Sequence, residues 1–185
     1  MDGPIKDVTS ELLYPLTLFC DSVNQEALGI QILEESELEE PYRGLLAHNS
    51  DMTTQLEVFH HGSIELLVLH CSMEGDSHRR EVVLLIKGSE KPVEYGAIDI
   101  NLAAFNEQVR EIIIQGQRPL GRILSEFNIN YRSEPMAFIK VTSNANINNA
   151  LGLTQSRVLY GRRNVLKGDL GIDIAHIIEI LPPSQ

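Results

Sequence analysis

The stretch IELLVLHCSMEGDSHRREVVLLIKGSEKPVEYGAIDI, residues 64–100, decides the fold of this chain. Apolar side chains recur with a period of two in residues 64–73, 79–87 and 92–100, which predicts three β-strands. The connectors between these strands, GDSH and GSEK, are short and polar, as hairpin turns are. The three strands are therefore expected to be antiparallel neighbours.

The period changes after the third strand. A helix is expected between Asn101, interpreted as its N-cap, and Gly116, which ends it. Its apolar residues at helical spacing are Phe105, Val109, Ile112 and Ile113. Pro119 then opens a second short helix with the sequence LGRILSEF.

Three further segments with strand character, residues 136–141, 156–167 and 171–181, follow these helices. Strands grouped along the chain, with helices set apart from them, indicate an α+β fold. We expect an antiparallel sheet of about six strands with the helices packed on one side.

Residues 1–40 are expected to form an N-terminal extension that packs on the domain or leads into it. This extension ends in an acidic run, with five glutamates in residues 34–41, that stops at Pro41. We interpret the run as a solvated surface segment before a proline boundary. Residues 41–185 then form the folded domain, and the whole chain is expected to be a single globular unit.

The composition is typical of one compact soluble domain: 185 residues, 43% hydrophobic, 22% charged and without Trp. Because 15 Lys and Arg face 26 Asp and Glu, the net charge is −11, which disfavours nucleic-acid and anionic membrane partners. A small anionic ligand would need a pocket with its own arginine. With no signal-peptide pattern and no apolar run of ~20 residues, we expect a cytoplasmic monomer or small homo-oligomer.

The sequence gives no support for a metal or an organic cofactor. The two cysteines, Cys20 and Cys71, match no ligand or redox spacing and are expected to be reduced, packed thiols. His60 and His61 are adjacent rather than at a metal-binding spacing. The glycine-rich motifs GxGxxG and GxSxG and the P-loop are also missing from the sequence.

Two charged residues are predicted to point toward the core. In RREVVLLIK, the period of two places Arg80 on one face with Val82 and Leu84, while Arg79 lies on the other face. In GIDIAHIIEIL, Glu179 shares its face with Ala175, Ile177 and Leu181. Because an isolated buried charge is costly, Arg80 and Glu179 either pair with each other or with backbone groups, or they line a polar pocket. In such a pocket the arginine would bind a carboxylate and the glutamate would bind a hydroxyl or handle a proton.

The basic doublet Arg162-Arg163 lies in a predicted strand, so its two side chains must face opposite sides of the sheet. One of them can line a site while the other is solvated. The alternative for this doublet is a surface salt bridge.

Several motifs, read in order, resemble those of the chorismate pyruvate-lyase family. They are NSDMTTQLE with Met52, the pair Arg80-Glu81 at a strand start, Pro119-Leu120-Gly121 after the long helix, the sequence GRR ending at Arg163, and Glu179 followed by Leu181-Pro182. The resemblance covers residues 41–183. The N-terminal 40 residues and the segment between the second helix and GRR have no clear counterpart in the family.

This resemblance implies an enzyme that converts chorismate to 4-hydroxybenzoate and pyruvate without metal or cofactor, on an antiparallel sheet with helical flaps over an internal cavity. It implies that Arg80 binds the ring carboxylate, helped by backbone N–H groups at Met52 and Leu120, and that Glu179 meets the ring hydroxyl and handles the proton. Arg162 or Arg163 would bind the second carboxylate. An enclosed cavity of this kind should show strong product inhibition.

Two other functions remain open for the same fold. One is a non-catalytic protein that binds an aromatic acid, because the fold is similar to that of the effector-binding domain of winged-helix bacterial regulators. The other is a lyase that acts on a related enolpyruvyl substrate.

Overall fold

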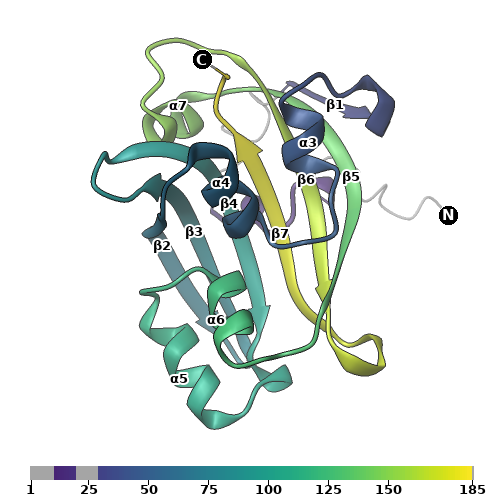
Figure 1. Cartoon of the computed structure of the whole chain (residues 1–185), viewed down its shortest axis with the longest axis vertical. Coiled ribbons are helices and arrows are strands. Elements are labelled where there is room, and N and C mark those ends of the chain that lie inside the picture. Colours follow the sequence, from purple (N-terminus) through teal and green to yellow (C-terminus); the bar gives the residue numbers. More distant parts are fainter. Residues whose placement is uncertain (1–10, 20–28, 185) are drawn as a thin grey trace, which may run out of the picture.

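A computed structural model of the chain describes residues 11–19 and 29–184. In this part of the chain one antiparallel sheet has seven strands in the order β1-β5-β6-β7-β4-β3-β2 (Figure 1). The strands are β1 (Gly29–Leu33), β2 (Ile64–Glu74), β3 (Ser77–Ile86), β4 (Lys91–Asn101), β5 (Arg132–Thr142), β6 (Val158–Lys167) and β7 (Asp173–Leu181). The predicted α+β class with an antiparallel sheet is confirmed.

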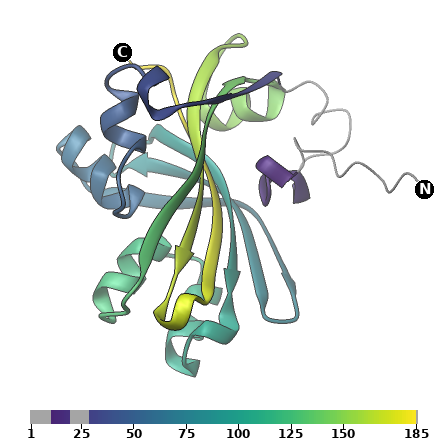
Figure 2. The ribbon, with the colours of Figure 1, turned by 90° about the vertical axis from the view of Figure 1, so that its right-hand side faces the viewer.

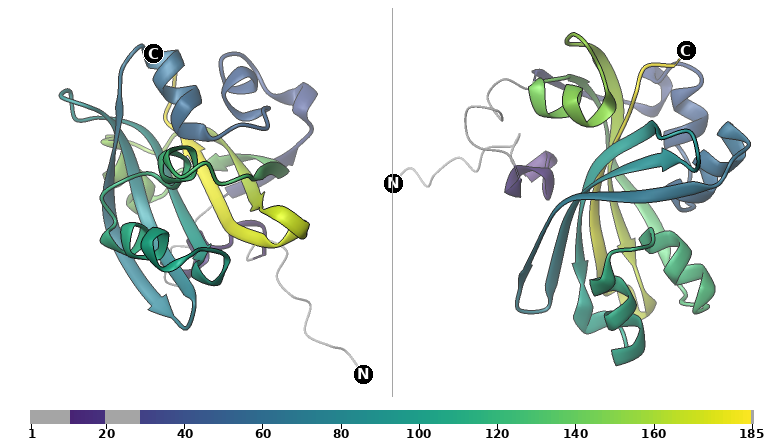
Figure 3. Two further views of the ribbon diagram at one scale, coloured as in Figure 1. Left: turned by 60° about the horizontal axis from the view of Figure 1, so that its bottom comes forward. Right: turned by 90° about the vertical axis from the view of Figure 1, so that its left-hand side faces the viewer.

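The helices lie on both faces of this sheet (Figures 2 and 3). Those of one face are α3 (Tyr42–Leu46), α4 (Met52–His60), α5 (Glu107–Gln115) and α6 (Leu120–Glu126). The other face carries α7 (Ala145–Leu151) and the 3₁₀ turn η1 (Leu16–Leu18). Three further 3₁₀ turns are η2 (Glu35–Glu37), η3 (Leu102–Ala104) and η4 (Asp169–Gly171). The expectation that helices pack on one side only is therefore corrected.

The three strands predicted from residues 64–100 form as two consecutive antiparallel hairpins, β2–β3 and β3–β4. β7, the last strand of the chain, inserts between β4 and β6. The strand predicted at residues 136–141 starts earlier, at Arg132, and contains an irregularity between Pro135 and Ala137. A proline inside a strand interrupts the regular ladder of hydrogen bonds. The segment predicted from the sequence, residues 136–141, is for this reason shorter than the strand.

Two elements were not expected. β1 lies in the segment assigned to the N-terminal extension and pairs with β5, so the sheet has seven strands rather than about six. Its five residues form a sheet edge and most are exposed, so they show little alternation. The other unexpected element is α7, which begins after its N-cap Asn144.

The helix expected directly after Asn101 begins later. Asn101 caps only η3, through a hydrogen bond from the Ala103 N–H to its side chain (3.1 Å). Asn106 caps α5 by accepting from the Val109 N–H (3.0 Å). Two asparagine caps five residues apart therefore divide the segment that was predicted to be one helix.

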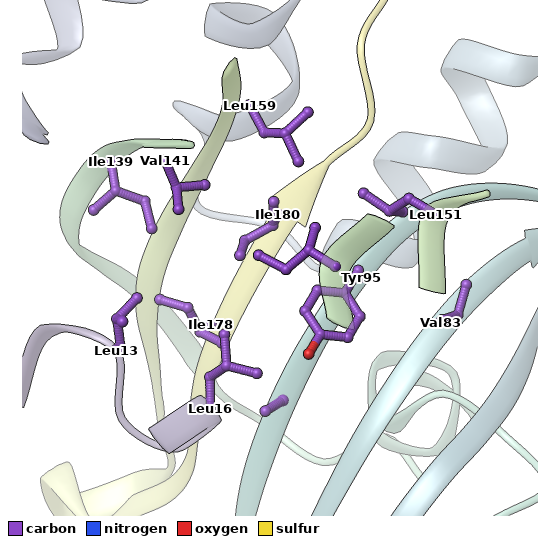
Figure 4. Close-up of a cluster of buried hydrophobic side chains, with 12 residues drawn as sticks. Leu13, Leu16, Val83, Tyr95, Ile139, Val141, Leu151, Leu159, Ile178 and Ile180 are labelled. Atoms are coloured by element: carbon purple, nitrogen blue, oxygen red, sulfur yellow. The ribbon is translucent and has the colours of Figure 1, made fainter. Parts of the chain in front are cut away.

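The apolar core has three parts. On the η1 and α7 face, Leu13 and Leu16 pack with Ile178 of β7 and with Ile147 and Leu151 of α7 (Figure 4 shows most of this cluster). On the opposite face one cluster lies under α5 and α6, and a second lies under α3 and α4. The polar residues described next lie on this opposite face of the sheet.

Several expectations from composition concern single residues. Cys71 is exposed on β2 rather than packed, and Cys20 lies outside the described residues. Within residues 11–19 and 29–184, no group of three or more His, Cys, Asp and Glu side chains could hold a metal ion. No helix in that same part of the chain is long and apolar enough to cross a membrane.

Candidate functional site: a cavity under two helix starts

A cavity lies between the sheet and the first turns of α4 and α6. Its floor comes from β3, β4, β6 and β7, and its roof is formed by Met52, Thr53, Leu120 and Gly121. The floor contributes mostly apolar side chains together with Arg80, Glu94, Asn164 and Glu179. The cavity volume is about 70 Å³, below the ~300–1,000 Å³ that is typical of ligand pockets. A ring-containing ligand would therefore require α4 and α6 to move away from the sheet.

Arg80 projects from β3 into this cavity, on the face that the period of two predicted. The residue is 2% exposed, and within the described residues its Nε and Nη1 atoms have no hydrogen-bond partner. Burial lowers the pKa of its guanidinium to about 10, so the group is still charged at neutral pH. A buried cation with free N–H donors is suited to bind an anion.

Glu179 lines the same cavity but does not pair with Arg80. Its carboxylate accepts a hydrogen bond from Nε of Arg162, its direct neighbour on β6. β4 separates Glu179 from β3, so Arg80 and Glu179 stand two strands, or about 10 Å, apart. The alternative in which these two residues form an ion pair with each other is wrong.

The two arginines of the doublet point to opposite faces, as predicted. Arg162 is fully buried, and its Nη1 donates to the carbonyl oxygens of Leu46 (2.9 Å) and His48 (3.0 Å). These bonds fasten the end of α3 and the following loop to the sheet. Arg163 lies on the other face, where Nη2 is 2.9 Å from Nδ1 of His176. Neither arginine is among the residues that line the cavity.

The two flap residues named by the resemblance come together at the roof. Met52 is the first residue of α4, whose N-cap Asp51 accepts a hydrogen bond from the Thr54 N–H (2.8 Å). Leu120 is the first residue of α6. A side chain at Gly121 would place its Cβ 2.8 Å from the Cβ of Asp51. The glycine therefore allows the starts of the two helices to touch.

Sequence reasoning missed Glu94 of β4. This residue lines the cavity, is 4% exposed, and its Oε2 has no partner among the residues that the structure describes. Burial and the charge of Glu179 raise the pKa of the Glu94 carboxyl well above its usual value, and Arg162 opposes this shift. Alternation in PVEYGAIDI places Glu94 on the face of Ile98 and Ile100, so the pattern that revealed Arg80 could have found it.

His78 is a second missed residue of this face. It precedes Arg80 by two positions on β3 and is 4% exposed. Neither ring nitrogen has a partner in the described part of the chain. Burial and the charge of Arg80 lower the pKa of the His78 imidazole, so the ring is neutral at pH 7. His78 is not among the residues that line the cavity.

Solved structures with the same fold are domains of bacterial regulators. The ligand-binding domain of a regulator assigned to the GntR family from Bordetella bronchiseptica superposes with a TM-score of 0.52 at 15% identity, over 66% of this chain and 87% of that one. The effector domain of PhnF from Mycobacterium smegmatis gives 0.55 at 12% identity, over 71% and 88%. The longer PhnF chain gives 0.56 at 13% identity, and this chain spans 63% of it. No family model and no curated protein sequence matches the chain.

The structural neighbours define the class of fold. It is the chorismate lyase-like fold in the form that regulator effector domains share. The expectation of lyase activity is wrong, because the neighbours are regulator domains rather than enzymes. Chorismate as the substrate and inhibition by the product both depended on lyase activity, and the structural neighbours do not support them.

Proposed function

We propose that this chain is a non-catalytic domain that binds a small carboxylic acid in the cavity under α4 and α6. The observation that carries the proposal is the Arg80 guanidinium, which is buried at the cavity wall with two nitrogen atoms unpartnered in the described chain. Charge-assisted hydrogen bonds to a ligand carboxylate would satisfy these donors. The roles of Met52, Leu120 and Glu179 in ligand contact are part of the same proposal.

The roof of the cavity supports the choice of an anion. The backbone N–H groups of Met52 and Thr53, in the first turn of α4, have no acceptor within their helix. The aligned peptide dipoles of α4 also place partial positive charge at this end. Both features add to the positive charge of Arg80, and the carboxylate of Asp51, the N-cap of α4, opposes them.

The walls of the cavity support an apolar ligand body. Val82, Leu84, Ile98, Leu166 and Ile177 line it. A carboxylate on an apolar skeleton matches one charged anchor surrounded by aliphatic side chains. The neighbours described as ligand-binding and effector domains also support a role in binding rather than catalysis.

The test is calorimetric titration with benzoate, cyclohexanecarboxylate and the uncharged analogue benzamide. We expect a carboxylate to bind at least about tenfold more tightly than benzamide. Arg80→Met should remove this difference, whereas Arg79→Met, which alters the neighbouring arginine on the opposite face, should keep it. The ligand should be recovered unchanged. Absence of binding by both acids, or unaltered binding in Arg80→Met, would refute the proposal.

A further inference from the structure

We infer that Glu94 recognises the far end of the ligand, by donating a hydrogen bond from its carboxylic acid group to a neutral oxygen. The cavity would then select an elongated monocarboxylic acid that carries a carbonyl, ether or hydroxyl oxygen opposite its carboxylate. This inference rests on the proposed function, because it takes Arg80 as the anchor of the ligand carboxylate.

The strand register places the two groups at opposite ends of the cavity. Arg80 on β3 lies beside Ile98 on β4, and Glu94 precedes Ile98 by four residues on the same face. Four residues of a strand span about 13 Å between Cα atoms. Both side chains line one cavity, so a single elongated ligand along β4 would reach both once α4 and α6 have moved away from the sheet.

Gly96 lies on β4 between the positions of Glu94 and Ile98. It is paired with Val82 on β3 and with Glu179 on β7. A Cβ at this position would be 2.2 Å from the carbonyl oxygen of Ile178, so the close approach of β4 and β7 requires glycine.

The surroundings of Glu94 leave its carboxyl available to a ligand. The nearby carboxylate of Glu179 takes the hydrogen bond from Arg162 Nε, whereas Oε2 of Glu94 has no partner in residues 11–19 and 29–184. A buried carboxyl without a hydrogen-bond partner is costly. A ligand oxygen at this position would remove that cost.

The surroundings of Glu94 favour the protonated form of its carboxyl group. Its burial and the negative charge of Glu179 raise the pKa of Glu94 well above the usual value, and the positive charge of Arg162 offsets part of this. Arg80 on β3 and Asp51 before α4 also line the cavity. His48, after α3, lies near the Arg162–Glu179 pair, and burial lowers the pKa of its imidazole. A protonated carboxyl has an O–H donor that a carboxylate lacks.

The experiment compares two probes of nearly equal shape, 4-acetylbenzoate and 4-isopropylbenzoate, which differ in a carbonyl oxygen. At pH 6.5 we expect the wild-type chain to bind the acetyl compound about tenfold more tightly. Glu94→Leu should abolish this preference, and Glu94→Gln should keep it because the amide is a donor. Glu111→Leu, on the exposed side of α5, is the control for a general effect of losing a carboxylate.

The pH dependence gives a second readout that does not depend on the stability of Glu94→Leu. Raising the pH favours the ionised form of Glu94, which lacks the O–H donor, so the preference for the acetyl compound should shrink in the wild-type chain. In Glu94→Gln the preference should persist across the same range.

Three outcomes would overturn the inference. If both probes bind with equal affinity and both depend on Arg80, Glu94 does not recognise the ligand, while the proposed function stands. A pH-independent preference in the wild-type chain would also contradict the role of the carboxylic acid. If neither probe binds, the proposed function fails together with the inference.

Discussion

The two faces of the sheet both bury polar side chains, but only one of them satisfies these groups internally. On the face covered by η1 and α7, Asp99 accepts hydrogen bonds from Tyr14 and Ser77. Glu81 accepts one from Tyr95 (2.6 Å), and its other oxygen lies 2.5 Å from Nδ1 of His70. We call this side the paired face.

On the face covered by α3–α6, several buried polar atoms have no partner within the described residues. They belong to His78, Arg80, Glu94 and Arg162, and we call this side the unpaired face. Every buried side-chain atom found unpartnered in residues 11–19 and 29–184 belongs to these four residues. Since each such atom costs about 1–3 kcal/mol, the unpaired face lowers stability where the proposed ligand binds.

Under the proposed function, this difference separates a structural polar network from a ligand site within one sheet. Buried polar groups that maintain the fold find partners within the fold, while groups kept for a ligand stay unpartnered until the ligand arrives. Substitutions on the paired face should therefore change stability, and substitutions on the unpaired face should change binding.

The largest effect is expected where the N-terminal segment packs on the paired face. Leu16 is 1% exposed in the cluster with Ile178, so Leu16→Ala should lower the free energy of unfolding by about 2–5 kcal/mol. Leu18, in the same turn, is 45% exposed, and Leu18→Ala should change it by less than about 0.5 kcal/mol. Urea titration measures both. Equal effects would mean that this segment is an extension independent of residues 41–185.

A smaller loss is expected from breaking the Glu81–Tyr95 hydrogen bond. Glu81→Ala leaves the buried Tyr95 hydroxyl without this acceptor, so the free energy of unfolding should fall by about 1–3 kcal/mol. Tyr95→Phe in the Glu81→Ala background should recover part of that loss. Strict additivity of the two substitutions would show that the bond contributes nothing to the paired face.

The pH dependence of stability tests His78 on the unpaired face. Because the folded state holds the His78 pKa below its usual 6.5, the unfolded chain takes up the proton first as the pH falls. The His78 contribution is therefore fully present above about pH 6.5 and is lost below it, with a slope of at most about 1.4 kcal/mol per pH unit. His78→Met should flatten the urea-unfolding profile between pH 7.5 and 5. An unchanged profile would show that His78 titrates alike in both states.

The smallest effect on stability is expected at Arg80. Since its Nε and Nη1 make no hydrogen bond in the described chain, Arg80→Met should keep the free energy of unfolding within about 1 kcal/mol of wild type or raise it. Arg79→Met removes ion pairs with Glu74 (2.7 Å) and Asp99 (3.5 Å) on the paired face, and should lower the free energy of unfolding by about 1 kcal/mol. A loss above 2 kcal/mol in Arg80→Met would place Arg80 among the structural residues.

Sequence periodicity predicted the strands of the central hairpins well, although β2 is an edge strand and most of its residues are exposed. β3 and β4 are the clearest examples, with buried residues along most of their lengths. β1 was missed because it is a run of only five residues, most of them exposed. The acidic run before Pro41 predicted a solvated surface segment. Leu33, just before the run, and Leu38, within it, are nevertheless buried.

The same periodicity found Arg80 and Glu179 but not their partners. A period of two says which face a side chain is on, but it does not say which strands become neighbours. Glu179 pairs with Arg162, 17 residues earlier, because β6 and β7 form a hairpin in that register. Glu94 lies in the same kind of pattern as Arg80, so the same reasoning from alternation places it on the inward face of β4.

The sequence by itself determined the antiparallel strands, the two helices after them and the inward direction of Arg80 and Glu179, because these depend on local periodicity and burial. Only the tertiary structure decided that β7 lies between β4 and β6, that Arg162 takes up Glu179, and that Arg80 and Glu94 share one cavity. Those features depend on long-range strand order and register. Such contacts are set by how all the elements pack together and are not encoded in any single segment.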